Sequence, residues 1–351
     1  MAAQIKLHPL AIILLLLSFT VQAFSESESK APEQCGSESV GGCHDKAAAL
    51  KLKIIAIFSI LVTSMIGVCL PLFSRSVPAL QPDRDLFVLV KAFASGVILA
   101  TGYMHVLPDS LDDLRSECLP ETPWRKFPFT TFVAMLAAVL TLMVDSVALS
   151  YYKKRYAKAA AVGDGEKAKN GTIELGDVGH GHVMDTEKGT QLLRYRVIAQ
   201  VLELGIVVHS VVIGLSMGAS GNPCTIRPLV VAICFHQLFE GMGLGGCILQ
   251  AEYGMKMKSI LVFFFSVTTP FGIALGIGLS NIYTENSPAA LIVEGVLNAA
   301  SAGLLNYMAL VDLLASEFMG PKLQGSLKLQ MWACTAVLLG AGAMSLMAKW
   351  A

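Results

Sequence analysis

Eight long apolar runs constrain the fold of this chain more than any other feature of its sequence. A run of about 20 apolar residues has the length that an α-helix needs to cross the hydrocarbon core of a bilayer. We therefore predict an all-α polytopic membrane protein with eight transmembrane helices. The runs lie at 54–73, 87–107, 128–150, 197–218, 228–250, 259–280, 289–314 and 331–348.

The composition of the chain supports this prediction and excludes several functions. Hydrophobic residues make up 54% of the chain and charged residues 15%, whereas about 25% of the residues of a soluble domain are charged. The formal net charge is zero, so there is no basic excess with which to bind a polyanion, and nucleic acid is excluded as a partner. The glycine-rich loop with Lys and Ser or Thr that binds ATP phosphates does not occur in the sequence.

Residues 1–23 resemble a secretory signal peptide that is cleaved at its end. Lys6 precedes an apolar stretch from Leu10 to Phe19, and small and polar residues follow. We therefore predict an extracytoplasmic N-terminal segment at 24–53. An uncleaved first helix is the alternative.

The distribution of Lys and Arg predicts the orientation of the helices. With an exported N-terminus, eight crossings place the C-terminus outside as well. Sixteen Lys and Arg residues then fall on the cytoplasmic side and nine outside, apart from Lys6, and cytoplasmic loops are rich in these residues. We predict that both termini are extracytoplasmic in a multi-pass protein of the plasma membrane, with helices one to three at 54–151 and helices four to eight at 196–351.

A polar segment at 152–195 separates the third and fourth apolar runs. It is rich in Gly, Lys, Glu and Asp and lacks hydrophobic periodicity, so we predict a disordered cytoplasmic loop. His180 and His182 within it could bind one zinc ion together, or they could belong to a plain solvated loop. The sequon at Asn170 lies in the same loop, where no glycan is expected.

Four cysteines fall in segments assigned to the extracytoplasmic side, where disulfides persist. They are Cys35, Cys43, Cys118 and Cys224. A bond between Cys35 and Cys43 is expected because a short loop closes easily. A tail in which Cys43 and His44 gather metal is the alternative.

Ionisable side chains inside the predicted spans are candidates for a functional site, since each costs about 2.5–3.5 kcal/mol near the centre of a bilayer. His236 and Glu240 in the fifth span are four residues apart and share one face of a helix. His209 lies near the middle of the fourth span. Together these side chains suit zinc, and also ferrous iron or manganese. Alternatively, each histidine bonds a carbonyl of a neighbouring helix.

Polar residues on either side of this centre predict a path for an ion. His105, Asp109 and Asp113 recur every four residues and form one stripe if the helix continues past Pro108. We expect this stripe to be an entrance, or otherwise a solvated helix end. The candidates for an exit toward the cytoplasm are Glu203, Asp145 and Asp312. The two aspartates could equally be interfacial residues without a role in transport.

The fourth span reads Glu203-Leu-Gly-Ile-Val-Val-His209-Ser-Val-Val-Ile-Gly214, and the fifth contains His236-Gln-Leu-Phe-Glu240-Gly241. These motifs resemble those of the ZIP (Zrt-/Irt-like) metal transporters, particularly the plant and fungal branch, and the resemblance covers essentially the whole mature chain. It implies metal ligation by His209, His236 and Glu240. Family members with two metals have an asparagine and an acidic residue where this chain has Ser210 and Gln237, so a strong second metal site is not expected.

The resemblance implies a transporter that moves zinc, and also iron or manganese, into the cytoplasm through the central His/His/Glu site without ATP. One alternative is an intramembrane zinc hydrolase, although no His-Glu-x-x-His motif is present. Another is a metal sensor that does not conduct. We predict no enzymatic activity and no cofactor besides the transported divalent ion. The sequence leaves the oligomeric state open, with a homodimer as one arrangement.

Overall fold

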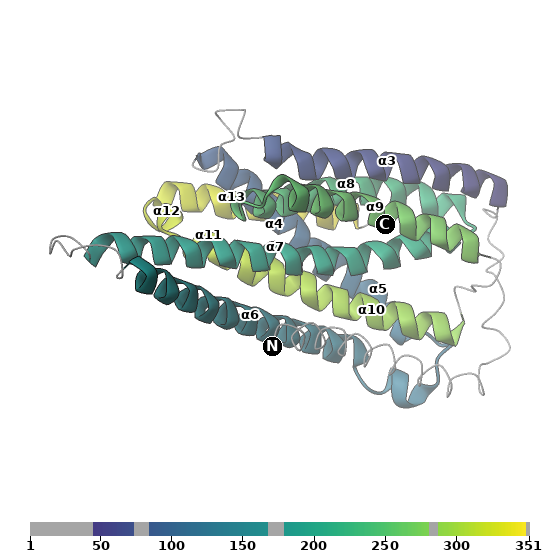
Figure 1. Ribbon diagram of the computed structural model, residues 1–351. Helices are drawn as coiled ribbons and strands as arrows, with labels where there is room; N and C mark the ends of the chain where they lie inside the picture. The colour runs from purple at the N-terminus through teal and green to yellow at the C-terminus, as the bar shows by residue number, and fades with distance from the viewer. Residues whose placement is uncertain (1–44, 74–83, 168–178, 281–286, 349–351) are drawn as a thin grey trace.

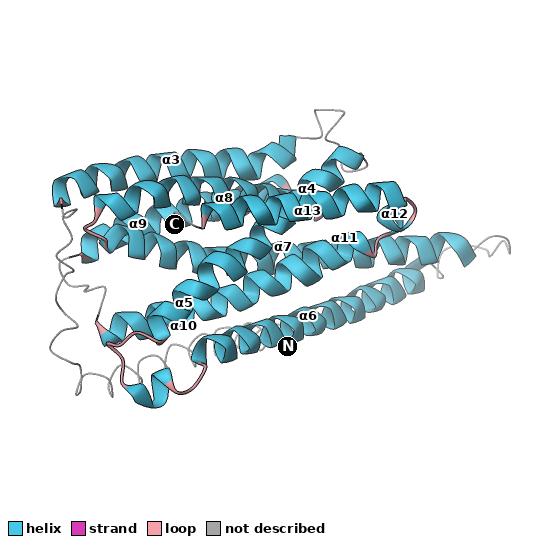
Figure 2. Ribbon diagram, turned by 180° about the vertical axis from the view of Figure 1, so that it is seen from behind, coloured by secondary structure: helices cyan, strands magenta, loops and turns pink. Residues whose placement is uncertain are grey.

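The computed structural model describes residues 45–73, 84–167, 179–280 and 287–348, and these residues are helical almost throughout, with no strand among them (Figures 1 and 2). The predicted signal peptide lies outside the described residues. In chain order the elements are α3 (Lys46–Phe73), α4 (Asp85–Thr101), η3 (Gly102–Val106), α5 (Leu107–Leu114), η4 (Glu121–Arg125), α6 (Phe129–Lys167), α7 (Gly179–Ala219), α8 (Pro223–Gln250), α9 (Met255–Leu279), α10 (Pro288–Tyr307), η5 (Met308–Ala315), α11 (Ser316–Phe318), α12 (Pro321–Gln324) and α13 (Leu327–Met347).

Eight helical stretches of the described chain are long and apolar enough to cross a membrane, which confirms the predicted all-α fold with eight spans. The second span combines α4, η3 and α5, and the seventh combines α10, η5 and α11. The second span continues past Pro108 as α5. Proline lacks a backbone N–H and interrupts the α-helical hydrogen bonds, and the π-helical turn η3 directly before α5 accommodates this interruption by a different hydrogen-bond spacing. The extracytoplasmic placement of the termini stays a prediction.

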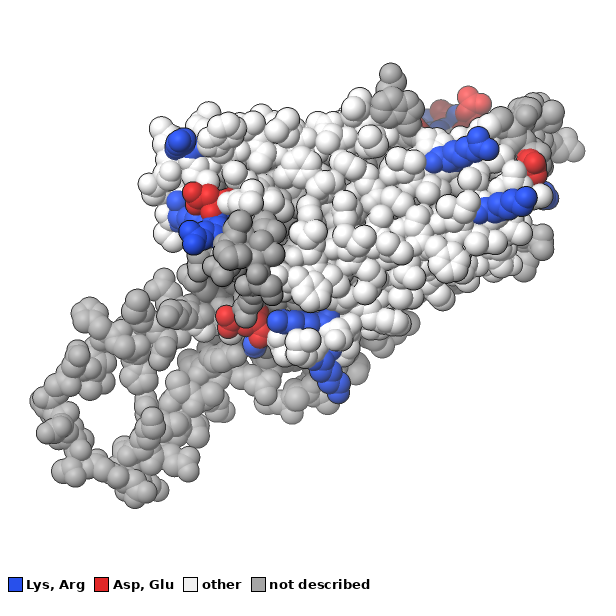
Figure 3. Space-filling view, turned by 90° about the horizontal axis from the view of Figure 1, so that it is seen from above, with Lys and Arg blue, Asp and Glu red and all other residues white. Residues whose placement is uncertain are grey.

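The outer faces of several spans are apolar and exposed. Phe58 on α3 is 63% exposed, Val147 on α6 is 67% exposed and Leu338 on α13 is 73% exposed. Figure 3 shows a broad face without charged side chains between charged residues at the two ends of the molecule. Such faces are unfavourable in water and suited to lipid. The chain is a multi-pass membrane protein.

The spans pack in two groups, which differ in their helix partners. In the first helix group, α3 packs chiefly on α8 and α7 packs on α9. In the second helix group, α4 packs on α13, while α10 packs on α5 and α6. Within each group the backbones touch: a Cβ at Gly276 of α9 would lie 2.3 Å from the Leu215 carbonyl oxygen of α7, and one at Gly340 of α13 would lie 2.1 Å from the Phe93 oxygen of α4. Glycine permits this close approach.

Apolar side chains fill the space between the two groups. Ile98 of α4, Leu202 of α7, Leu244 of α8 and Leu305 of α10 belong to one buried cluster. The approach here is looser than inside the groups, since a Cβ at Gly205 of α7 would meet its nearest atom, a side-chain carbon of α10, at 3.4 Å. Side chains and not backbones therefore define the boundary between the groups.

The helices extend beyond the predicted spans. α6 continues to Lys167 and α7 already begins at Gly179, so both enter the segment 152–195 for which the sequence predicts disorder. Their ends lie at the same end of the bundle as α12 (Figure 1). The helices are longer than predicted for two physical reasons. In α6, the stretch 156–161 is rich in Ala and contains Lys, and both residues favour helix. In addition, a helix that has already formed gains one hydrogen bond for each residue it adds.

The start of α3 also differs from the prediction, because it lies at Lys46 inside the expected polar segment 24–53. Lys53 is buried, and its Nζ donates a hydrogen bond of 2.7 Å to the carbonyl oxygen of Gly218. Gly218 lies in the last turn of α7, where carbonyl groups lack partners within the helix and carry partial negative charge. This lysine can therefore lie inside the protein.

Candidate metal centre

Three buried side chains from two neighbouring helices form the centre of the candidate site. His209 comes from α7, and His236 and Glu240 come from one face of α8. Each residue offers one ligand atom, and these atoms all lie within 4.8 Å of one another. The three side chains are 2%, 1% and 0% exposed respectively. The structure thus brings together the three residues that the sequence places at the centre.

The polar atoms of these three residues have no hydrogen-bond partner among the described residues. This holds for both ring nitrogens of His209, both ring nitrogens of His236 and both carboxyl oxygens of Glu240. A buried polar group without a partner costs roughly 1–3 kcal/mol. Two imidazoles and one carboxylate can bind Zn²⁺ and leave a position for water, and the same donors suit ferrous iron. A divalent ion would therefore satisfy groups that the protein leaves unpaired.

His105 lies beside this centre. Its ring centroid is 6.0 Å from that of His236 and 6.4 Å from that of His209, and the two central rings are 5.9 Å apart. The side chain is buried, and its Nε2 has no partner among the described residues. Its Nδ1 lies 3.9 Å from an oxygen of Asp109. The sequence places His105 in one stripe with Asp109 and Asp113, but its distance from the central histidines is known only from the structure, because position along a helix does not reveal how the helix crosses its neighbours. The entrance role of the stripe stays a prediction.

Ser210 and Gln237 each follow a central histidine. Both are 1% exposed, and neither the Ser210 hydroxyl nor the Gln237 side-chain nitrogen has a partner among the described residues. Both side chains are neutral, so they add no negative charge to the centre. The expectation of one strong metal site stays a prediction.

The predicted entrance acids lie on α5 and meet an acid of α10. The side chain of Asp109 is 51% exposed. Asp113 lies beside Glu294 and Asn298 of α10. The two spans thus form an acidic group between solvent and His105, and Glu294 joins the predicted stripe only through tertiary packing.

The predicted exit acids lie on three different spans. Glu203 on α7 is 8% exposed and stands six residues before His209, which corresponds to about 9 Å along a helix. Asp145 on α6 lies beside Asp312 on η5 and accepts a 3.2 Å hydrogen bond from the Tyr307 hydroxyl of α10. The pairing of the two aspartates and the contribution of Tyr307 could not be inferred from the sequence.

Comparison with known proteins identifies the family. The family model described as ZIP Zinc transporter matches residues 50–348. This chain belongs to the ZIP family. It is 63% identical to Fe(2+) transport protein 1 of Oryza sativa subsp. japonica, over 92% of this chain and 89% of the relative. It is 60% identical to Fe(2+) transport protein 2 of the same plant and 58% identical to Zinc transporter 7 of Arabidopsis thaliana, and both matches cover 97% of each chain.

Membership of the ZIP family makes this protein a membrane transporter and not an enzyme. The alternatives of an intramembrane hydrolase and a non-conducting sensor receive no support. His180 and His182 lie in the first turn of α7 of this ZIP protein, and their side chains are not among those described.

Proposed function

We propose that this ZIP protein carries zinc, with ferrous iron as a second substrate, from the extracytoplasmic side into the cytoplasm. The observation that supports the proposal is the buried cluster of His209, His236 and Glu240, whose ligand atoms have no other partner among the described residues. Relatives that are named zinc and Fe(2+) transporters support both ions. Manganese stays a third candidate, because carboxylate and imidazole donors also accept it.

The polar groups outside the centre would act as steps for the ion. Asp109 and Asp113 would attract it, and His105 would pass it to the central residues, since its ring centroid lies 6.4 Å from that of His209 and 6.0 Å from that of His236. On the other side, Glu203 and then the pair Asp145 and Asp312 would receive it. Each step replaces some of the water around the ion with protein donors.

The inward direction rests on the orientation of the helices. Cys118 and Cys224 are both disulfide-bonded, and both lie in segments that the charge distribution assigns to the outside, where disulfides persist. The expected bond between Cys35 and Cys43 lies outside the described residues. A doubly charged ion that crosses an inside-negative membrane gains about 4.6 kcal/mol per 100 mV. Inward transport therefore needs no ATP.

Uptake of radioactive zinc and ferrous iron into liposomes that contain the purified protein tests the proposal. Protein-containing liposomes should accumulate both ions faster than empty ones, and an inside-negative potential should increase the rate because the ion is positively charged. Binding of zinc without any accumulation would contradict the proposal and favour a sensor.

A further inference from the structure

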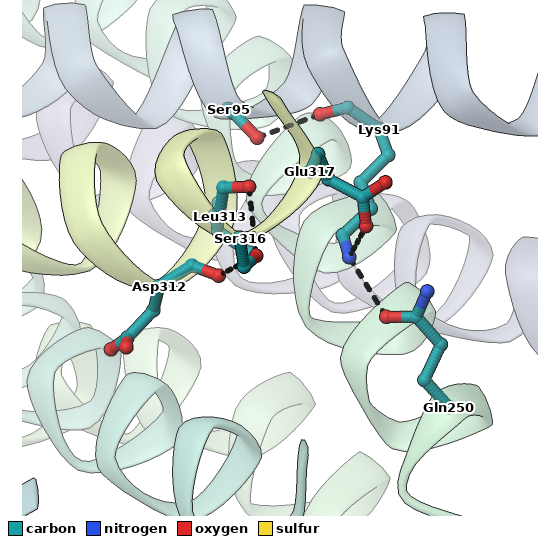
Figure 4. Close-up of polar contacts among 7 residues, drawn as sticks. All are labelled: Lys91, Ser95, Gln250, Asp312, Leu313, Ser316 and Glu317. Atoms are coloured by element: carbon teal, nitrogen blue, oxygen red, sulfur yellow. Dashed lines mark hydrogen bonds and ion pairs between the residues drawn. The ribbon is translucent and has the colours of Figure 1, made fainter. Parts of the chain in front are cut away.

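Lys91 is a buried lysine that the proposed ion path does not use. It lies near the beginning of α4 and is 5% exposed. Its Nζ donates hydrogen bonds to a carboxyl oxygen of Glu317 at 2.5 Å and to the side-chain oxygen of Gln250 at 2.8 Å (Figure 4). It also lies 5.8 Å from the centre of the Tyr195 ring. A buried charge is unfavourable unless it is paired and hydrogen-bonded, so these partners hold the ammonium group in place.

The partners of Lys91 belong to different helix groups. Glu317 lies on α11, at the end of the seventh span, and thus in the second helix group together with Lys91. Gln250 is the last residue of α8, and Tyr195 lies on α7, so both belong to the first helix group. The Lys91 cluster, defined as Lys91, Glu317, Gln250 and Tyr195, therefore joins the two groups at the end of the molecule that is predicted to face the cytoplasm.

The two types of contact in the Lys91 cluster differ in strength. The contact to Glu317 stays within one group and joins two charges, whereas the contacts to Gln250 and Tyr195 cross the boundary and join a charge to neutral groups. Charge-assisted pairs are the stronger hydrogen bonds. An ammonium group has three donors, so Lys91 can release Gln250 while it keeps Glu317. The cluster can thus open between the groups without leaving a buried lysine unpaired.

The cluster is also close in the chain to an acid of the proposed path. Glu317 follows Asp312 by five residues, and the hydroxyl of Ser316 donates a hydrogen bond to the Asp312 carbonyl oxygen (Figure 4). The two acidic side chains therefore lie on one continuous stretch of the seventh span, formed by η5 and α11. A movement of this stretch when an ion reaches or leaves Asp312 would move Glu317 as well.

We propose that the Lys91 cluster is a reversible clamp that closes the cytoplasmic end of the boundary between the two helix groups and must open in each transport cycle. The proposal rests on the transport function proposed above. Away from the central site, the groups meet largely through apolar side chains, and such contacts are not directional, so they favour one position of the groups less strictly than a hydrogen bond does. A directional, buried and charged contact such as the Lys91–Gln250 hydrogen bond sets one position.

The reactivity of Cys247 reports whether the clamp is closed. Cys247 is a free, buried cysteine one turn before Gln250 on α8. In Gln250→Leu the ion pair of Lys91 with Glu317 remains, and a membrane-impermeant thiol reagent applied to the cytoplasmic side should label Cys247 about threefold faster or more, because local opening becomes more frequent. Mass spectrometry of the peptide that contains Cys247 measures the rate.

Lys322→Met provides the matched control. Lys322 lies 3.5 Å from Asp85 in an ion pair at the same end of the molecule, but Asp85 begins α4 and Lys322 lies on α12, which packs on α13 and α11, so this pair stays on the side of the second helix group. This variant should label Cys247 at the wild-type rate. If Gln250→Leu also labels at the wild-type rate, the cluster does not hold the boundary closed and the inference is wrong.

A cross-link tests whether the clamp must open during transport. In a background without the free cysteines Cys69, Cys234, Cys247 and Cys334, Lys91→Cys is combined with Gln250→Cys, and a flexible bifunctional thiol reagent joins the two. Lys91→Cys with Glu317→Cys is the control, because that cross-link stays within one group. Zinc uptake should fall about tenfold or more in the first variant and stay within about twofold in the second, each relative to the same variant before cross-linking.

The outcomes separate this inference from the proposed function. Uptake by the Lys91→Cys, Gln250→Cys protein that is unchanged after complete cross-linking overturns the clamp and leaves the transport function intact. If the wild-type protein takes up no ion, the transport function itself fails. If the cysteine variants do not fold, the labelling of Cys247 in Gln250→Leu still decides whether the cluster holds the boundary closed.

Discussion

At the scale of single residues, the most informative feature is a set of buried polar atoms that the protein does not satisfy. His209, His236 and Glu240 bury six nitrogen and oxygen atoms without a hydrogen-bond partner in the described part of the chain. Each such atom is unfavourable on its own, and a bound divalent ion satisfies several at once. Binding of the ion should therefore stabilise the folded protein as well as begin transport.

Replacement of any central residue by alanine should remove most of the transport. His209→Ala, His236→Ala and Glu240→Ala each delete one donor that no neighbour replaces, so zinc uptake should fall about tenfold or more, with the protein still present in the membrane. Ser266→Ala is the control, because Ser266 is also buried with an unpartnered oxygen among the described residues but lies on α9. Near-normal uptake by two of the three variants would contradict the assignment.

His105→Ala should separate delivery of the ion from its binding. If His105 passes the ion to the centre, the variant should take up zinc about tenfold more slowly. Zinc should still bind the central site and raise the melting temperature of the variant. At a zinc concentration of 100 times Kd, this stabilisation corresponds to about 2.7 kcal/mol. Differential scanning fluorimetry of the purified protein measures the second quantity. Loss of the zinc-dependent stabilisation would instead make His105 a ligand of the central site.

At the scale of helices, small residues decide which spans pack backbone to backbone. Gly276 on α9 faces Gly218 on α7, and a Cβ at Gly276 would lie 2.3 Å from a carbonyl oxygen. Gly278 is two residues further on the same helix and has no atom within 4 Å of such a Cβ. Two glycines of one helix thus have opposite environments, and only the first is required by packing.

These two glycines allow a matched test of helix packing. Gly276→Ala should destabilise the protein by about 1–3 kcal/mol, because α7 and α9 must move apart. Gly278→Ala should be neutral or stabilise it by up to about 1 kcal/mol, because alanine loses less backbone entropy than glycine in a helix. Thermal unfolding in detergent measures both variants. Equal melting temperatures would show that the close contact is not required.

At the scale of the whole molecule, the central site lies at a boundary between two packed helix groups. The three central residues, His209, His236 and Glu240, lie on helices of the first helix group. The spans of the second helix group carry the other polar residues of the path, namely His105, Asp113, Asp145 and Asp312. An ion that follows the proposed path would therefore contact both groups in turn. This arrangement explains how a buried site could exchange ions with both surfaces.

His180 and His182, in the polar segment 152–195, should not belong to the ion path. His180 and His182 lie far along the chain from every central residue, and on the predicted topology they meet zinc only after it has crossed. The double variant His180→Ala, His182→Ala should keep initial zinc uptake within about twofold, because no residue of the central site is lost, and should change the response to high internal zinc. A loss of uptake as complete as in His209→Ala, or a glycan on Asn170, would contradict this assignment.

The sequence by itself determined the number of spans and proposed the three residues of the central site. Hydrophobic runs are local, so their length predicts each span without knowledge of its neighbours. The spacing of His236 and Glu240 is also local, because helical geometry alone puts residues four apart on one face. His209 is proposed from its position near the middle of the fourth span, and the resemblance of its motif to the ZIP family supports that proposal.

Only the tertiary structure decided which distant residues meet. It placed His105 beside the central histidines, paired Asp145 with Asp312, and surrounded Lys91 with Glu317 and Gln250. These contacts join helices far apart in the chain, and they depend on the angle, rotation and depth at which each helix packs. Side-chain shapes across the interfaces set those quantities, so no periodicity within a single span could reveal them.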